Sequence, residues 1–274
     1  TYGPLLFAAL GKPAREFAKI KELVDESIGA MPIEKLSRRP QTADLREVMG
    51  PLALIGIDQE GGSVIRVTSL PQAPAAMALG AVGDLALARE VGAAVSRGLR
   101  SLGINWNFAP VLDLNNNPHN PVIAERSFGA EPKRAAELAM AWMAGSHAEG
   151  VACCVKHFPG HGFVKADSHV AVPVDQRSLK AILADDAKPY EWLSTSLTAV
   201  MPAHVVYPKV DSHPAGFSPR WLKEILRGQL GYTGAICCDD LSMEGARRLD
   251  GQLVSYTDAA IAALGAGCDL VLLC

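Results

Sequence analysis

The sequence predicts an α/β protein and, within that class, a (β/α)8 barrel of the TIM type. Short and almost continuously apolar strands alternate with helices, which is typical of a parallel sheet buried on both faces. Polar, titratable residues follow the carboxyl ends of five of these strands. A doubly wound sheet binds its ligand mainly at one switch point, whereas a barrel brings every carboxyl end onto one face. Five polar strand ends therefore favour the barrel.

Apolar runs, the spacing of apolar residues and the positions of turn residues predict six strands and the helices between them. In chain order we expect a strand at 52–57, a helix at 85–102, a strand at 104–110, a helix at 133–149, a strand at 151–155, a helix-rich segment to about 196, a strand at 198–201, a helix at 219–230, a strand at 234–238, a helix at 257–265 and a strand at 268–273. Asp84 is the expected N-cap of the first helix, and Gly103 and Gly150 are expected to end the first two. Residues 1–50 are less regular, with helical periodicity at 16–28 and Thr42 as a candidate N-cap.

A barrel has eight strands, so two remain to be placed. We expect one around Leu5-Leu6-Phe7 and one within residues 185–196. The chain also stops at a strand, where a barrel would have one more helix, so we expect a barrel that is incomplete or irregular at both ends. No linker or internal repeat divides the sequence, and residues 1–274 are interpreted as a single barrel domain.

The composition is that of an ordinary globular protein. The 274 residues are 49% hydrophobic and 20% charged, and the net charge of −3 gives no basic excess for a nucleic-acid partner. No apolar run approaches the ~18–20 residues of a membrane span. Two adjacent cysteine pairs, Cys153-Cys154 and Cys237-Cys238, lie in apolar strands, where neighbours point to opposite faces. We therefore expect buried free thiols and a reducing compartment.

Asp239 is the first polar residue after the strand at 234–238, and Asp240 follows it. An aspartate at this position can act as a nucleophile, a base, a metal ligand or a helix N-cap. Two successive aspartates cannot occupy the same cap, so one of them is left for another task.

Asp167 and His169 form an Asp-x-His pair on a loop rich in Gly and Pro. A histidine can donate and take back a proton near neutral pH, and a neighbouring carboxylate can orient its ring. A solvated loop histidine is the structural alternative.

The remaining charged candidates are of both signs. Asp58, Arg66, Arg126 and Lys156 would hydrogen-bond a polyhydroxylated ligand or would form a structural ion-pair network. A zinc hydrolase is a further alternative, because four histidines lie at or beyond strand ends: His157, His161, His169 and His204. Their spacing lacks an H-x-H pair and matches no recognised ligand pattern, so we predict no metal and no other cofactor.

Seven motifs in order resemble glycoside hydrolase family 3, and within it the bacterial β-N-acetylhexosaminidases. The resemblance covers about residue 50 to the end, and residues 1–50 match poorly. The motifs are Ile57-Asp58-Gln59-Glu60-Gly61-Gly62, Phe108-Ala109-Pro110-Val111-Leu112-Asp113, Glu125-Arg126-Ser127-Phe128-Gly129, Lys156-His157-Phe158-Pro159-Gly160-His161-Gly162, Asp167-Ser168-His169, Met201-Pro202-Ala203-His204 and Asp239-Asp240-Leu241-Ser242-Met243. The family usually has Ser or Thr before the nucleophile, where this chain has Cys238.

The resemblance implies a retaining exo-glycosidase that removes terminal β-linked N-acetylglucosamine from peptidoglycan fragments in the cytoplasm. Asp239 would be the nucleophile, and His169, oriented by Asp167, the acid and base. The sugar would be bound by Asp58, Arg66, Arg126, Lys156 and His157. A β-glucosidase and a phosphorylase that uses phosphate in place of water are the alternatives within the family.

Overall fold

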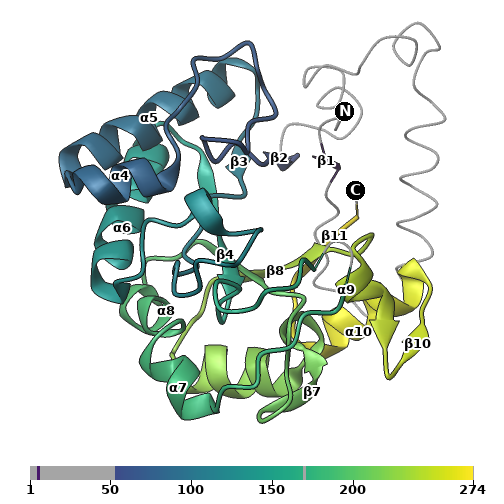
Figure 1. Cartoon of the computed structure of the whole chain (residues 1–274). Helices are drawn as coiled ribbons and strands as arrows, with labels where there is room; N and C mark the ends of the chain where they lie inside the picture. The colour runs from purple at the N-terminus through teal and green to yellow at the C-terminus, as the bar shows by residue number, and fades with distance from the viewer. Residues whose placement is uncertain (1–4, 7–52, 169–170, 274) are drawn as a thin grey trace, which may run out of the picture.

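The structure, a computed structural model, describes residues 5–6, 53–168 and 171–273. Strands and helices alternate along most of this length (Figure 1). The first half contains β1 (Leu5–Leu6), β2 (Ile55–Ile57), α4 (Ala76–Val82), α5 (Leu85–Ser101), β3 (Trp106–Asn107), the 3-10 turn η2 (Ala124–Arg126), α6 (Pro132–Ala148) and β4 (Ala152–Phe158). The second half contains α7 (Leu179–Ala184), α8 (Lys188–Leu193), β5 (Ala199–Pro202), β6 (Val206–Tyr207), β7 (Asp211–Pro214), the 3-10 turn η3 (Ala215–Phe217), the π-helix η4 (Arg220–Gln229), β8 (Ala235–Asp240), α9 (Glu244–Arg247), β9 (Arg248–Leu249), β10 (Gln252–Leu253), α10 (Tyr256–Ala266) and β11 (Leu270–Leu272).

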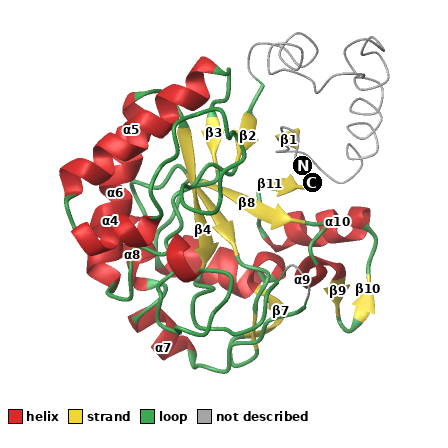
Figure 2. Ribbon diagram, turned by 45° about the horizontal axis from the view of Figure 1, so that its top comes forward, coloured by secondary structure: helices red, strands yellow, loops and turns green. Residues whose placement is uncertain are grey.

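One seven-stranded sheet organises the fold, in the order β1-β2-β3-β4-β5-β8-β11. Every neighbouring pair is parallel except β1 and β2, which are antiparallel. Helices lie along the outside of the strands, and in both views the two end strands, β1 and β11, lie side by side (Figures 1 and 2). The predicted α/β class with a parallel sheet is confirmed, and the sheet is curled.

Both faces of the sheet are buried, which explains why the strands read as continuous apolar runs. The larger core cluster contains side chains such as Ile55, Val155 and Val200 together with helix residues including Leu99 and Trp142. A smaller cluster takes the alternate residues of the strands: Trp106, Phe108, Cys154, Ala199, Met201, Cys237, Leu270 and Leu272. Neighbouring positions of one strand thus belong to different apolar layers.

The helix-terminating residues act as the sequence predicts. The Asp84 carboxylate accepts hydrogen bonds from the backbone N–H groups of Ala86 and Leu87, at 2.8 and 3.3 Å. Gly103 and Gly150 follow α5 and α6 with φ of 77° and 73°, a region that glycine enters without steric cost. The expected helix at 16–28 and the cap at Thr42 lie outside the described residues.

The strand predicted within residues 185–196 is wrong, because this segment forms α8. Pro189 stands at the start of that helix, and the buried Tyr190 and Leu193 are three residues apart, which places them on one helical face. The strand predicted at Leu5-Leu6-Phe7 is confirmed as β1 over Leu5–Leu6.

The free thiols are confirmed for five described cysteines, all buried and unbridged: Cys153, Cys154, Cys237, Cys238 and Cys268. Among the described helices, none has the length and apolar character required to cross a bilayer.

Candidate active site

A pocket of about 230 Å³ opens where the strands of the parallel sheet end. Polar and apolar side chains that are far apart in the sequence line it, and three of the five polar strand ends meet here, those at Asp58, at Lys156-His157 and at Asp239. Ligand sites for drug-sized molecules measure about 300–1,000 Å³, so this pocket suits one small polar ligand unit. Six of the eight predicted site residues line it: Asp58, Arg66, Arg126, Lys156, His157 and Asp239.

The end of β2 presents two carboxylates to this pocket. Asp58 and Glu60 line the pocket, while the intervening Gln59 is buried, as expected of alternating side chains in an extended chain. The Gln59 side-chain oxygen accepts hydrogen bonds from the backbone N–H groups of Arg66 and Val67, at 2.9 and 3.0 Å. Gln59 therefore holds the loop that carries Arg66 against the strand end.

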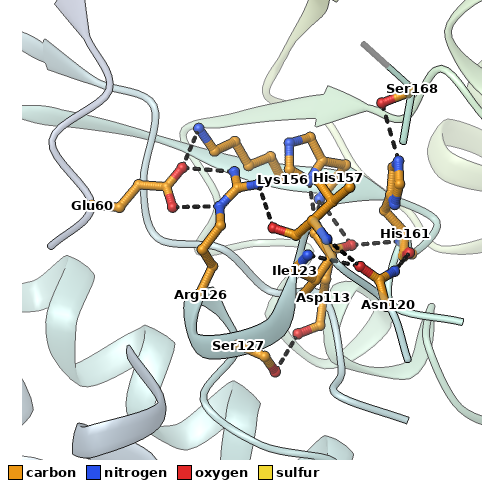
Figure 3. Close-up of polar contacts among 12 residues, drawn as sticks. Glu60, Asp113, Asn120, Ile123, Arg126, Ser127, Lys156, His157, His161 and Ser168 are labelled. Carbon is orange, nitrogen blue, oxygen red and sulfur yellow. Dashed lines mark hydrogen bonds and ion pairs between the residues drawn. The ribbon is translucent and has the colours of Figure 1, made fainter. Parts of the chain in front are cut away.

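Glu60, Arg126 and Lys156 form a buried charge cluster on one side of the pocket (Figure 3). The Arg126 guanidinium donates two hydrogen bonds to the Glu60 carboxylate, at 2.8 and 2.9 Å. The Lys156 ammonium lies 2.7 Å from Glu60 Oε1 and 2.6 Å from Asp58 Oδ1. Such a bidentate pair fixes the plane of the guanidinium, so the cluster is rigid before any ligand binds.

The charges in this cluster stabilise one another. Burial would raise the pKa of Glu60, but Lys156 and Arg126 lower it to about 2. Burial would lower the pKa of Lys156, but Asp58 and Glu60 hold it above its ordinary value. Glu60, Arg126 and Lys156 are therefore charged at neutral pH, and a polar ligand meets fixed donors and acceptors.

A second buried carboxylate, Asp113, orients His157 in β4 and His161 just after it (Figure 3). Asp113 Oδ2 lies 2.6 Å from His157 Nδ1, and Asp113 Oδ1 accepts a hydrogen bond of 2.7 Å from the His161 backbone N–H. Burial alone would raise the pKa of Asp113, but the charge and hydrogen bond of His157 lower it. With Nδ1 occupied by Asp113, His157 presents Nε2 to a ligand in the pocket.

The two aspartates at the end of β8 have different roles. Asp240 accepts hydrogen bonds from the Ser242 backbone N–H and hydroxyl, at 2.8 and 2.6 Å, and so shapes the turn. Asp239 lines the pocket, and burial would raise its pKa, but the imidazoles of His157 and His204 and the backbone N–H of Asp240 lower it. An ionised carboxylate facing a pocket is the form required of a nucleophile.

Of the predicted acid, His169, and its partner, Asp167, the structure describes only Asp167. Asp167 is half-buried and is not among the pocket-lining residues, whereas Ser168 beside it is. His169 lies outside the described residues. Within the part of the chain that is described, no group of three or more His, Cys, Asp or Glu side chains could hold a metal ion.

Sequence reasoning assigned no catalytic or sugar-binding role to Glu60, Asp113, His161 and Ser168, although each of them stands in a quoted motif and His161 was considered as a zinc ligand. Two buried cations near one pocket require a counter-charge, and Glu60, two residues after Asp58, has the spacing that places it on the same side of the strand. That signal could have identified Glu60. The contacts of the other three depend on chain crossings that the sequence does not reveal.

A family model and curated sequences both relate this chain to glycosyl hydrolases. Residues 28–274 match the family described as Glycosyl hydrolase family 3 N terminal domain. A protein named beta-hexosaminidase from Bordetella avium (strain 197N) is 48% identical over 242 residues, which cover 85% of this chain and 68% of that protein. The chain spans about two thirds of the length of the curated relatives it matches, such as 64% of a beta-hexosaminidase from Bordetella pertussis (strain Tohama I / ATCC BAA-589 / NCTC 13251).

Solved structures agree with the sequence comparison. A glycoside hydrolase family 3 beta-N-acetylglucosaminidase from Paenibacillus sp. str. FPU-7 superposes with a TM-score of 0.78 at 39% identity, covering 85% of this chain and 45% of that chain. NagZ from Neisseria gonorrhoeae, solved in complex with N-trifluoroacetyl-D-glucosamine, superposes with a TM-score of 0.77 at 40% identity, covering 89% of this chain and 70% of that chain.

Proposed function

The chain belongs to glycosyl hydrolase family 3, and on this premise we propose that it is a retaining exo-acting β-N-acetylhexosaminidase that removes terminal β-linked N-acetylglucosamine. The observation that carries the proposal is the Asp239 carboxylate, kept ionised at a strand end that faces a small pocket of fixed charges. A relative of 40% identity was solved with an N-acylated glucosamine derivative, which supports the same glycone here.

In this mechanism Asp239 attacks the anomeric carbon and forms a covalent glycosyl-enzyme. His169, oriented by Asp167, protonates the leaving oxygen and then removes a proton from the water that attacks the intermediate. The histidine replaces the acid carboxylate of most retaining glycosidases. Asp58, Arg66, Arg126, Lys156 and His157 hold the sugar through its hydroxyl groups and its N-acetyl group.

Water is the acceptor that the pocket charges favour. Two cationic side chains that line the pocket, Lys156 and Arg126, are already paired with carboxylates. Two further carboxylates, Asp239 and Asp240, line the same pocket. These carboxylates would repel a phosphate dianion but not a neutral water molecule, so hydrolysis is proposed in preference to phosphorolysis.

The proposal also covers the barrel that carries the site and the compartment in which the protein acts. The adjacency of β1 and β11 in both views supports a sheet that curls into a (β/α)8-type barrel (Figures 1 and 2). Five buried free cysteines support a reducing compartment, and with it a cytoplasmic role on peptidoglycan fragments during recycling.

The test is release of the aryl group from an aryl N-acetyl-β-glucosaminide, with the glucoside and N-acetylgalactosaminide for comparison. We expect the first substrate to be preferred, and Asp239→Ala to reduce kcat on the order of 10⁶-fold, as loss of a nucleophile does. Asp240→Asn is the matched control, because it keeps an oxygen for the Ser242 turn, and it should retain most activity. Substantial turnover by Asp239→Ala would refute the assignment of the nucleophile.

A further inference from the structure

His204 is a fully buried histidine to which the proposed mechanism gives no task. It follows β5, has 0% of its surface exposed and is not among the residues that line the pocket. Neither of its ring nitrogens has a hydrogen-bond partner among the described residues. Buried polar side-chain atoms are in the large majority hydrogen-bonded, so an imidazole with both nitrogens unpartnered calls for an explanation.

The register of the sheet places this histidine beside the proposed nucleophile. Strands β5 and β8 are parallel, with Val200 opposite Ile236, and the same register continued past β5 brings residues 203–204 alongside 239–240. Because Asp239 lines the pocket and His204 does not, the imidazole lies behind the nucleophile as seen from the sugar. Burial lowers the pKa of this imidazole, while the carboxylate and backbone of Asp239 oppose the effect, so the ring is neutral at pH 7 and carries one N–H.

Packing on three sides fixes the imidazole of His204. Its ring stacks on that of Phe217 in η3, with the centroids 5.3 Å apart and the planes inclined by 15°. A Cβ at Gly216 would lie 3.5 Å from His204 Nδ1, so the backbone of η3 also passes beside the ring. A Cβ at Gly245, in the helix α9 that follows β8, would lie 2.9 Å from His204 Cβ. The ring is therefore held in one orientation without any hydrogen bond of its own.

We propose that His204 is a positioning residue for the nucleophile, whose ring N–H holds the backbone at Asp239 and Asp240 so that the Asp239 carboxylate faces the anomeric carbon. The inference rests on the proposed function, since it assigns a task within that mechanism. Catalytic hydrogen bonds are often long without substrate and shorten when it binds, which fits a ring that faces this backbone but completes no hydrogen bond. A nucleophile supported in this way attacks from one defined geometry.

A fluorinated sugar tests the nucleophile separately from the acid. With a 5-fluoro-N-acetylglucosaminyl fluoride, an oxygen of Asp239 forms a bond to C1 while the C1–F bond breaks and fluoride leaves with the electron pair. Fluoride is a good leaving group that does not depend on proton donation, so the rate of labelling reports on Asp239. Mass spectrometry gives the first-order rate constant at saturation and the half-saturating concentration, and neither depends on how much of the protein is folded.

We expect His204→Phe, which keeps a ring but no N–H, to lower the labelling rate at saturation about tenfold, the effect of losing one hydrogen bond. The half-saturating concentration should not change, because His204 does not line the pocket. His204→Asn and His204→Gln return an N–H near Nδ1 and Nε2, respectively, and one of them should recover most of the rate. The matched control is Tyr232→Phe, which removes a buried donor that lies 2.6 Å from the Ala235 carbonyl oxygen, at the other end of β8, and its rate should equal that of the wild type.

A wild-type labelling rate in His204→Phe, or equal losses in all three His204 variants, would overturn the positioning role while leaving the proposed activity intact. Phe217→Leu loosens the ring without removing its N–H and should lower the rate in the same direction, so it decides the matter if His204→Phe does not fold. A wild-type chain that is not labelled at Asp239 would instead overturn the proposed function, and the inference with it.

Discussion

At the scale of the residue, Glu60 is the centre of the buried charge cluster, because it neutralises both Arg126 and Lys156. Glu60→Gln keeps its shape but leaves two buried cations short of a counter-charge, so we expect a loss of about 3 kcal/mol in the free energy of unfolding at pH 7. Denaturant unfolding measures this loss. Glu149→Gln is the control, because its ion pair with Arg97 is exposed and worth at most about 1 kcal/mol.

The same residue predicts a pH dependence. The pKa of Glu60 is lowered from 4.5 to about 2, so its stabilisation is fully present above pH 4.5 and is lost as the pH falls through about 2. The wild type should therefore lose stability in this window, and Glu60→Gln should lack that part of the slope. Parallel slopes in the two proteins, or equal losses in Glu60→Gln and Glu149→Gln, would contradict the cluster's role.

The site residues that could be predicted are those that follow an apolar run. Asp58, Asp239 and the pair Lys156-His157 each come directly after an apolar run in the sequence, and all of them line the pocket. The pairing of Glu60 with Arg126 could not be predicted in the same way, because the two residues are 66 positions apart and meet only through the fold.

At the scale of the element, the sequence predicted those helices and strands whose local patterns agree with the way they pack in the fold. Helices α5 and α6 were predicted together with the glycines that end them, and α5 also with its N-cap Asp84, because periodicity and cap chemistry are local. The Glu131 cap of α6 was not predicted. The segment 185–196 failed because a short apolar run does not distinguish a buried strand from a buried helix. The segment expected to be helix-rich contains α7 and α8, and the polar loop before α7 carries His161 and Ser168, which line the pocket.

Helices α5 and α6 pack closely through glycines, which gives an element-scale prediction. A Cβ at Gly145 in α6 would lie 2.0 Å from the Arg89 carbonyl oxygen of α5. We expect Gly145→Ala to lower the free energy of unfolding by about 1–3 kcal/mol through overpacking. Gly265→Ala in α10 is the matched control, since no atom lies within 4 Å of its Cβ, and it should raise stability by about 0.4–1 kcal/mol. Equal effects in the two helices, measured by denaturant unfolding, would refute the packing argument.

At the scale of the whole molecule, the pocket gathers side chains from the ends of β2, β4, β8 and β11 and from the turn η2. The class of fold and the face that carries the site could be predicted, because apolar strands and polar strand ends are repeated along the sequence. How the two edge strands, β1 and β11, lie relative to each other could not, because they come from the two ends of the chain.

A ligand that contacts several strand ends at once should stabilise the whole domain rather than one loop. At 100 times its Kd a ligand adds about 2.7 kcal/mol, which in a domain of this size corresponds to a rise in Tm of about 5–11 °C. We expect this for N-acetylglucosamine in a thermal unfolding scan, and a smaller rise for glucose, which lacks the acetamido group. Asp58→Ala removes one sugar contact at the end of β2, so its Tm should rise less at the same N-acetylglucosamine concentration, relative to its own unliganded value. An equal rise in this variant would place the bound sugar outside the pocket and separate binding from the strand-end residues.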